Sequence, residues 1–195
     1  MKHPLIFAAM LPLAGCISFG AKPPASLLNL TATAPLSAKA ERAVNAGDTI
    51  AVNIPVVPQA IATTRVVVSD GATAIAYVPK AAWVEAPARL FQRLLVETIG
   101  TRTNKIVIDT RQVSIEPASR LSGQLLQFGL DASTRDAVIV YDAVWSAGEG
   151  KPTLTRRFEK RVNAVAIDAV SVGPALNAAA NGLAADVAAW IGGTG

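Results

Sequence analysis

The chain has 195 residues, of which 51% are hydrophobic and 16% are charged, and its formal net charge is +4 at pH 7. Its length suits one domain with a sizeable core, and a charge this mild does not indicate nucleic-acid binding. The one histidine, His3, and the one cysteine, Cys16, both lie near the N-terminus, so the rest of the chain has neither imidazole nor thiol. This excludes Ser-His and Cys-His nucleophilic mechanisms, ordinary zinc sites and a structural disulfide there.

Carboxylates are the remaining candidates for catalysis, because a pair of them is sufficient for glycoside hydrolysis. The acidic residues are scattered singly along the chain, and Asp70, Asp131, Asp136 and Glu149 fall in expected turns or solvated loops. We therefore expect no enzyme activity, no cofactor and no metal site.

The first 15 residues have the pattern of a secretory signal peptide. Lys2 gives a positive start, and residues 4–12 are apolar but too few to span a bilayer, which takes about 20. Residues 13–16, Leu-Ala-Gly-Cys, resemble the bacterial lipobox, in which an apolar residue and two small residues precede the cysteine. We expect cleavage before Cys16 and its acylation with chains such as palmitate, which anchor a protein stably when there are two or more. Ile17, in place of an aspartate, resembles an outer-membrane sorting signal and predicts an outer-membrane lipoprotein facing the periplasm.

Residues 16–47 predict a lipidated tether, because they are rich in Ala, Pro, Ser and Thr and poor in large apolar side chains. Within this segment, residues 26–31 alternate enough to predict a first strand, at an edge of the sheet. Residues 48–195 are expected to form the folded domain.

The first half of that domain predicts three strands and a helix. Residues 49–54 alternate with period two, and residues 65–68 and 73–78 predict a hairpin, because Asp70-Gly71 between them tolerates positive φ. Pro79 is expected to end the hairpin's second strand. From Trp83 to Ile99 the apolar spacing is helical, and the helix is expected to begin near Ala86.

The second half predicts a short strand at 106–108 and then three long strands, followed by a helix. The long strands at 120–132, 136–146 and 154–162 are separated by polar turns, which favours an antiparallel meander. Ser171 suits a helix N-cap ahead of an apolar stripe that runs to Trp190. The element order predicts one α+β domain, with a mostly antiparallel sheet and both helices packed on one face.

Residues 156–161, Arg-Arg-Phe-Glu-Lys-Arg, form the one basic run of the chain. On a strand, Arg157, Glu159 and Arg161 would share one face. One interpretation is a charged edge strand that discourages aggregation, and another is a patch for anionic lipid or an acidic partner. Tyr77, Trp83 and Trp145 likewise suit either a core or a partner surface.

The order of these elements resembles a known family. After the lipobox come a leucine-rich segment at 27–30, an Ile-x-Val strand ending in prolines at 50–55, an Arg-Val-Val-Val strand at 65–68 and Trp83 ahead of a helix. This pattern is similar to that of the ABC-type transport auxiliary lipoproteins. One departure is Ala62-Thr63-Thr64, where members often have an acidic residue, so a contact shaped by that acid is in doubt here.

The resemblance implies a non-enzymatic docking role in transport between membranes. The implied partners are an MCE-domain protein and an ABC permease and ATPase, with phospholipid as a candidate cargo and self-association of the chain expected. Only Cys16, the acylation site, transfers residue by residue. Two other hypotheses remain: an assembly or pilot lipoprotein that chaperones a barrel or secretin, and a lipid carrier in its own right.

Overall fold

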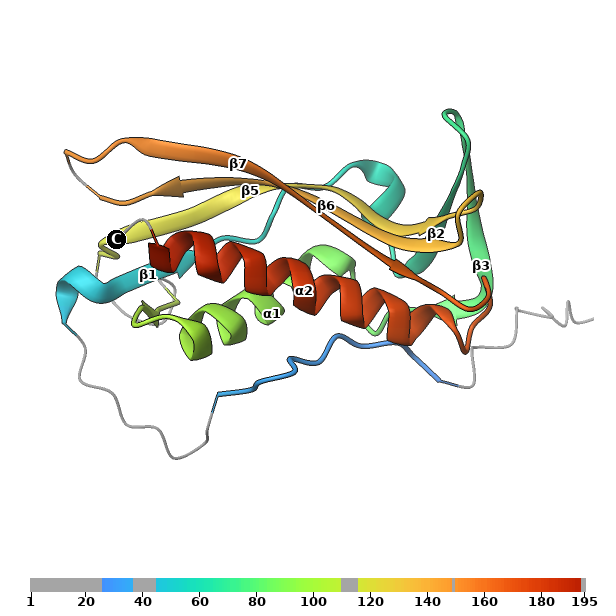
Figure 1. Cartoon of the computed structure of the whole chain (residues 1–195), viewed down its shortest axis with the longest axis horizontal. Helices are drawn as coiled ribbons and strands as arrows, with labels where there is room; N and C mark the ends of the chain where they lie inside the picture. The colour runs from blue at the N-terminus through green and yellow to red at the C-terminus, as the bar shows by residue number, and fades with distance from the viewer. Residues whose placement is uncertain (1–25, 37–44, 110–115, 149, 194–195) are drawn as a thin grey trace, which may run out of the picture.

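The computed structural model describes residues 26–36, 45–109, 116–148 and 150–193. Within them, seven strands form one mixed sheet, and two helices, α1 (Pro87–Arg102) and α2 (Val172–Gly193), cover one face of it (Figure 1). The predicted α+β domain with both helices on one side of the sheet is therefore confirmed.

The predicted meander forms the backbone of this sheet. Strands β5 (Ser119–Asp131), β6 (Asp136–Ser146) and β7 (Thr153–Asn163) are antiparallel neighbours. The β6–β7 register runs without a break from Asp136 opposite Asn163 to Ser146 opposite Thr153, and β7 has no second neighbour among the described strands. β7 is thus an edge strand that carries the basic run.

The other side of β5 is shared by two separate strands. Its first residues pair with β1 (Thr49–Val52), and its last residues pair with β2 (Arg65–Asp70), both in parallel. β4 (Ile106–Val107) extends the sheet beyond β1, also in parallel, and β3 (Ala74–Ala82) pairs with β2 as the predicted hairpin. Short 3-10 helices at Ala46–Asp48 and Gln59–Ile61 precede β1 and β2.

The expectation that Pro79 ends the second hairpin strand is wrong, because β3 continues to Ala82. The register shifts between Arg65 and Val67, and Lys80 has a φ of 60°, so the strand passes the proline through an irregularity. β3 pairs only with β2 among the described strands, and an edge strand tolerates a proline because the missing N–H costs no ladder bond on its free side.

Aromatic side chains fill the space between sheet and helices. Trp83 and Phe128 meet edge-on with ring centroids 5.4 Å apart, and Phe91 of α1 meets Tyr141 of β6 at 5.3 Å. Trp145 is 2% exposed, so both it and Trp83, also 2% exposed, belong to the core rather than to a partner surface. Tyr77 is half-buried, with the Arg65 guanidinium 3.5 Å above its ring.

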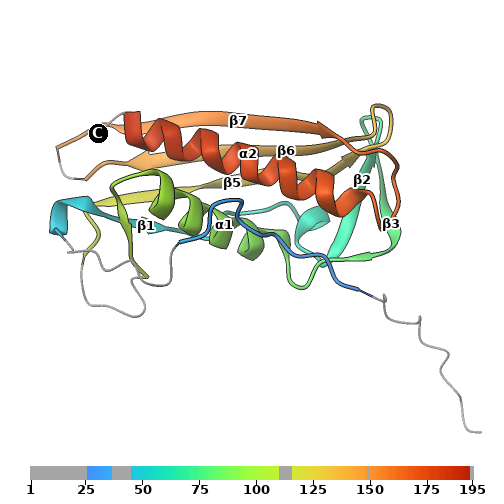
Figure 2. The same cartoon turned by 60° about the horizontal axis from the view of Figure 1, so that its bottom comes forward.

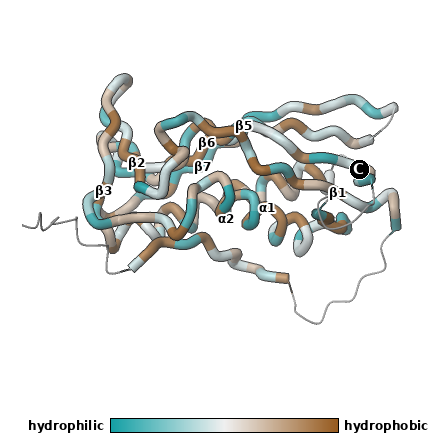
Figure 3. Tube along the Cα trace, turned by 180° about the vertical axis from the view of Figure 1, so that it is seen from behind, coloured by the Kyte–Doolittle hydropathy of each residue, from teal (hydrophilic) through white to brown (hydrophobic). Residues whose placement is uncertain are grey.

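Residues 26–36, which we call the strap, lie outside any regular strand. The strand predicted at 26–31 is reduced to one bridge, in which Leu28 pairs with Trp83. Seen from below and from behind, the strap begins at the β3 end of the domain and runs across the outer side of the helices (Figures 2 and 3). The domain start predicted at residue 48 stays a prediction, although the strap packs on that domain.

Candidate functional site: the strap, the groove beside α1 and the charged strand

Cys16, the predicted acylation site, lies outside the described residues. The described chain resumes at Ser26, ten residues later. The candidate site therefore consists of the strap, which lies within the predicted tether, and of the surfaces around it.

Two asparagines of α2, one helical turn apart, hold the strap by hydrogen bonds. The Thr31 N–H donates to the side-chain carbonyl of Asn177 at 3.0 Å, and the Thr33 N–H donates to that of Asn181 at 2.9 Å. The Asn181 amide in turn donates to the carbonyl oxygens of Thr31 and Asn177, both at 2.9 Å. Positions i and i+4 share one helix face, so the two asparagine side chains can both form hydrogen bonds with the strap backbone, much as a neighbouring strand would.

Leucine residues fix the strap near both of its ends, Leu28 through hydrogen bonds and an apolar contact and Leu36 through an apolar contact. Leu28 donates its N–H to Ala82 at 2.7 Å, and its carbonyl accepts from Val84 at 2.9 Å. The Leu28 side chain lies so close to Gly173 that a Cβ there would approach it to 2.9 Å, and Leu36 covers Gly100 of α1 in the same way at 3.2 Å. Glycine at these two places lets the strap approach the helices closely.

A groove of about 770 Å³ lies between the outer side of α1 and the edge formed by β1 and β4. It is open on one side, and its lining mixes apolar and charged side chains. The lining residues are Ala51, Val52, Asn53, Ile54, Glu85, Arg89, Gln92, Arg93, Val96, Glu97, Val107, Ile108 and Asp109.

Two interactions shape one side of this groove. Arg93 forms an ion pair with Glu85, one on α1 and the other just before it, and the Gln92 side chain donates to the carbonyl of Val52 at 3.1 Å. Arg89 is exposed on the same helix and has no charged partner among the described residues. The groove thus offers one free guanidinium beside an apolar floor, which suits an extended or amphipathic partner segment.

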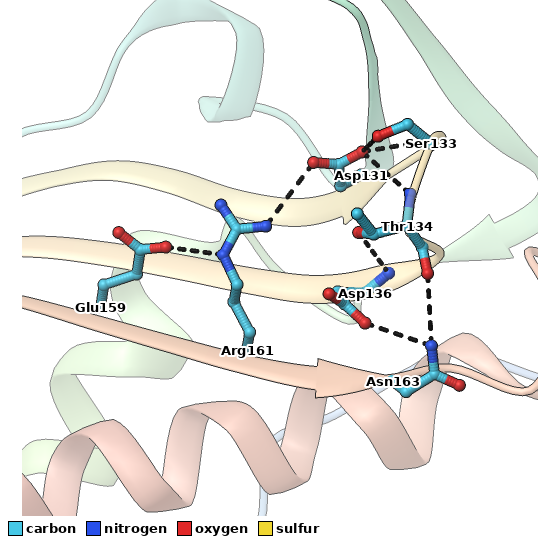
Figure 4. Close-up of polar contacts among 7 residues, drawn as sticks. All are labelled: Asp131, Ser133, Thr134, Asp136, Glu159, Arg161 and Asn163. Carbon is cyan, nitrogen blue, oxygen red and sulfur yellow. Dashed lines mark hydrogen bonds and ion pairs between the residues drawn. The ribbon is translucent and has the colours of Figure 1, made fainter.

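A polar network closes the turn between β5 and β6 (Figure 4). The Asp131 carboxylate accepts from the Ser133 hydroxyl at 2.6 Å and from the Ser133 and Thr134 N–H groups at 2.9 and 3.3 Å. These donors, the Ser133 hydroxyl first, lower the pKa of Asp131. The Asn163 amide donates to Asp136 at 3.1 Å, which ties the end of β7 to the turn. The network explains Asp131 and Asp136 as turn residues, as predicted, whereas Glu149 lies outside the described residues.

The basic run of β7 is largely neutralised within the domain. On the outer face Arg157 makes a bidentate contact with Asp142, both distances 2.6 Å, which lowers the pKa of Asp142, and Arg161 binds Glu159 at 2.7 Å. On the helix side Lys160 pairs with Asp186 of α2 at 3.0 Å. Because most of these charges have partners, the geometry favours the charged edge strand over a free anion-binding patch.

Sequence reasoning did not identify the strap's asparagines or the groove. The groove draws its lining from four segments between residues 51 and 109, and no periodic pattern marks a site of this kind. The described residues hold no cluster of metal-ligating side chains. Among them, no helix is both long enough and apolar enough to cross a membrane.

Comparisons with known proteins place this fold. A search of curated proteins finds no match. Over 74% of the chain, the structure is similar to a solved structure described as that of an uncharacterized protein, of which it covers 92%, with a TM-score of 0.64 and 14% sequence identity. Over 89% of the chain, the structure is also similar to that of a Xanthomonas campestris protein of family DUF330, of which it covers 95%, with a TM-score of 0.66 and 15% sequence identity. At these identities the likeness shows the fold alone.

The family of the chain is shown by a match to a family model, and not by the structural similarity. Residues 29–188 match the model of the ABC-type transport auxiliary lipoprotein component. The match begins inside the strap and ends near the end of α2, so it spans most of the described chain. By this match the chain belongs to the family of ABC-type transport auxiliary lipoprotein components, as its sequence pattern predicted.

Proposed function

We propose that this chain is a non-enzymatic docking component, anchored by acylated Cys16 in the outer membrane, that joins an ABC-type system moving hydrophobic cargo between membranes. Its partners in this proposal are an MCE-domain protein together with an ABC permease and ATPase. The family match over residues 29–188 is the observation that carries the proposal.

The length of the tether supports a role at a membrane surface. Ser26 lies ten positions after Cys16, and an extended chain spans at most about 3.6 Å per residue, so the domain would stay within about 36 Å of the bilayer. Confinement to such a layer raises the effective concentration of the domain near a partner that reaches the same membrane.

We place the partner contact at the groove beside α1. Its mixed apolar and charged lining suits a protein segment better than a lipid tail, because Arg89 is exposed and the Gln92 side chain donates to the Val52 carbonyl. A lipid carrier would instead enclose its cargo in an apolar cavity.

The direct experiment is crosslinking in cells followed by purification of the chain. We expect the MCE-domain protein and the ABC components in the crosslinked material, and a chain-to-chain product if the proposed self-association is correct. Cys16→Ala should leave the domain folded but lose these partners. Recovery of a barrel or secretin with no MCE or ABC component would refute the proposal in favour of a pilot lipoprotein, and phospholipid co-purifying with the delipidated chain would favour a carrier.

A groove variant tests where the partner binds. Arg89→Glu reverses an exposed charge on α1 without touching the core, so we expect it to fold normally and to lose the crosslink to the partner. Lys151→Glu, the same charge change in the exposed β6–β7 turn, is the matched control and should crosslink as the unaltered chain does. Equal crosslinking of both variants would exclude the groove as the contact.

A further inference from the structure

Exposed apolar side chains gather at one end of the domain. Eight large hydrophobic residues are exposed among the described residues; four of these belong to the strap, the residue after Trp83 and the β7–α2 loop, and a fifth, Ile75, lies on β3 beside the hairpin turn. Val165 and Val170 are the most exposed of the eight, at 84% and 83%, and both lie in the loop from β7 to α2. The other two of the four are Leu27 at 54% and Val84 at 50%.

Contacts bring the strap, Val84 and the first turn of α2 together. Leu27 precedes Leu28, whose carbonyl accepts from the Val84 N–H, and the Leu28 side chain abuts Gly173 in the first turn of α2. Figures 1 and 2 both show the β7–α2 loop and the start of the strap at the same end, opposite the end of α2. We call Leu27, Val84, Val165 and Val170 the apolar tip.

The loop that carries the two valines is held in shape. The Ala164 N–H donates to the carbonyl of Arg135 at 2.9 Å, and the Asp168 carboxylate accepts from the N–H groups of Val170 and Ser171 at 2.9 and 2.8 Å. A loop with fixed backbone keeps its valines in solvent, where each exposes an apolar side chain that water solvates poorly. Four such exposed side chains on adjoining segments are typical of a contact surface.

We propose that the apolar tip inserts into the surface of the lipid bilayer to which the chain is anchored. This inference rests on the proposed acylation of Cys16, because the chain enters the described domain at this tip, ten residues after that cysteine. The described chain begins at Ser26 beside this tip, so an anchor at Cys16 restrains the tip more closely than it restrains the opposite end of α2. Interfacial apolar groups of this kind sit at the boundary between headgroups and acyl chains.

Charge at the tip is compatible with this placement. Asp168 is the one charged residue of the loop, and its carboxylate is occupied by backbone N–H groups. Nearby Arg135 and Lys80 are exposed and have no carboxylate partner among the described residues, so they can face anionic headgroups.

The test uses the full acylated chain with a thiol-reactive environment-sensitive fluorophore on Val165→Cys or Val170→Cys. Acylated Cys16 has no free thiol and is not labelled. The protein is reconstituted on vesicles of phosphatidylethanolamine and phosphatidylglycerol, with and without lipids that carry a doxyl quencher near the head of the acyl chain. Val56→Cys is the control, since Val56 is 68% exposed but lies opposite Gln124, seven residues along β5 from Asp131 and hence roughly 23 Å from the tip end.

We expect blue-shifted emission and quenching by the doxyl lipid at positions 165 and 170, and neither at position 56. Unshifted emission at both tip positions in a protein that floats with the vesicles would overturn the membrane contact while leaving the anchor and the docking role intact. A blue shift without doxyl quenching would also overturn it, because the tip would then be covered by a second copy of the chain. Failure of the protein to float would remove the anchor and this inference together.

Discussion

We predict that the free energy that holds the strap on α2 depends mainly on one side chain. Asn181 is 9% exposed and forms two hydrogen bonds to the strap, with the Thr33 N–H and the Thr31 carbonyl. Each such bond contributes about 0.5–1.5 kcal/mol net, so Asn181→Ala should weaken the attachment of the strap by about 2 kcal/mol. The lost bond to the Asn177 carbonyl lies within α2, where the higher helix propensity of alanine offsets it.

Amide hydrogen exchange measures this attachment directly. A loss of about 2 kcal/mol corresponds to about a 30-fold faster exchange at the Thr33 amide if the strap opens without the rest of the domain. Asn177→Ala is the matched control, because it removes only the bond to the Thr31 N–H and should cost about 1 kcal/mol, a roughly fivefold effect.

The two variants separate two explanations of how the strap is held. An unchanged exchange rate at Thr33 in the Asn181 variant would refute the reasoning, and would show that the Leu28 and Leu36 contacts hold the strap without the asparagines. Equal acceleration at amides of β5 and of the strap would also refute it, because the strap would then open only with the whole domain.

Two further predictions concern the core. The Tyr141 hydroxyl donates to the Ser122 carbonyl at 2.9 Å, and burial raises the pKa of Tyr141 above its usual range near 10. As pH rises, the tyrosine of the unfolded chain loses its proton at lower pH than that of the folded chain. The free energy of unfolding should therefore be constant below about pH 10 and decrease above it. Tyr141→Phe should reduce this decrease, as measured by denaturant unfolding at a series of pH values. Gly129→Ala should destabilise the domain by about 1–3 kcal/mol in urea unfolding, since a Cβ there would lie 2.4 Å from the Val67 carbonyl oxygen, whereas Gly47→Ala, in open space, should be neutral. A stable Gly129 variant would show that β2 and β5 can separate.

The parts of the fold that local patterns determine were predictable. Polar turns between alternating runs indicated the β5–β6–β7 meander, and Asp70-Gly71 indicated the hairpin, because turn chemistry acts over neighbouring residues. The parallel pairing of β1 and β2 with the two ends of β5 was not predictable, since each partner lies dozens of residues away and nothing local specifies the pairing.

The misjudged proline and the unforeseen site have related causes. Pro79 suggested a strand end. On a strand with one neighbour, however, the missing N–H of proline costs no hydrogen bond, and the number of neighbours depends on the tertiary fold and not on the local sequence. Asn177 and Asn181 resemble ordinary polar residues of a helix until the strap is seen to lie across them. The residues that line the groove come from four segments, and they adjoin one another only after the chain has folded.

The strap also determines how the domain responds to force. If a partner pulls the domain away from the membrane, the load enters at Ser26 and reaches the Leu28 bridge and the two asparagines before it reaches β5, β6 and β7. These few bonds break at lower load than the long ladder of β5, β6 and β7. Release of the 11 residues of the strap would lengthen the tether by up to about 40 Å while the sheet and helices stay folded. In the proposed anchored protein, the strap would therefore supply extra tether length while the partner moves.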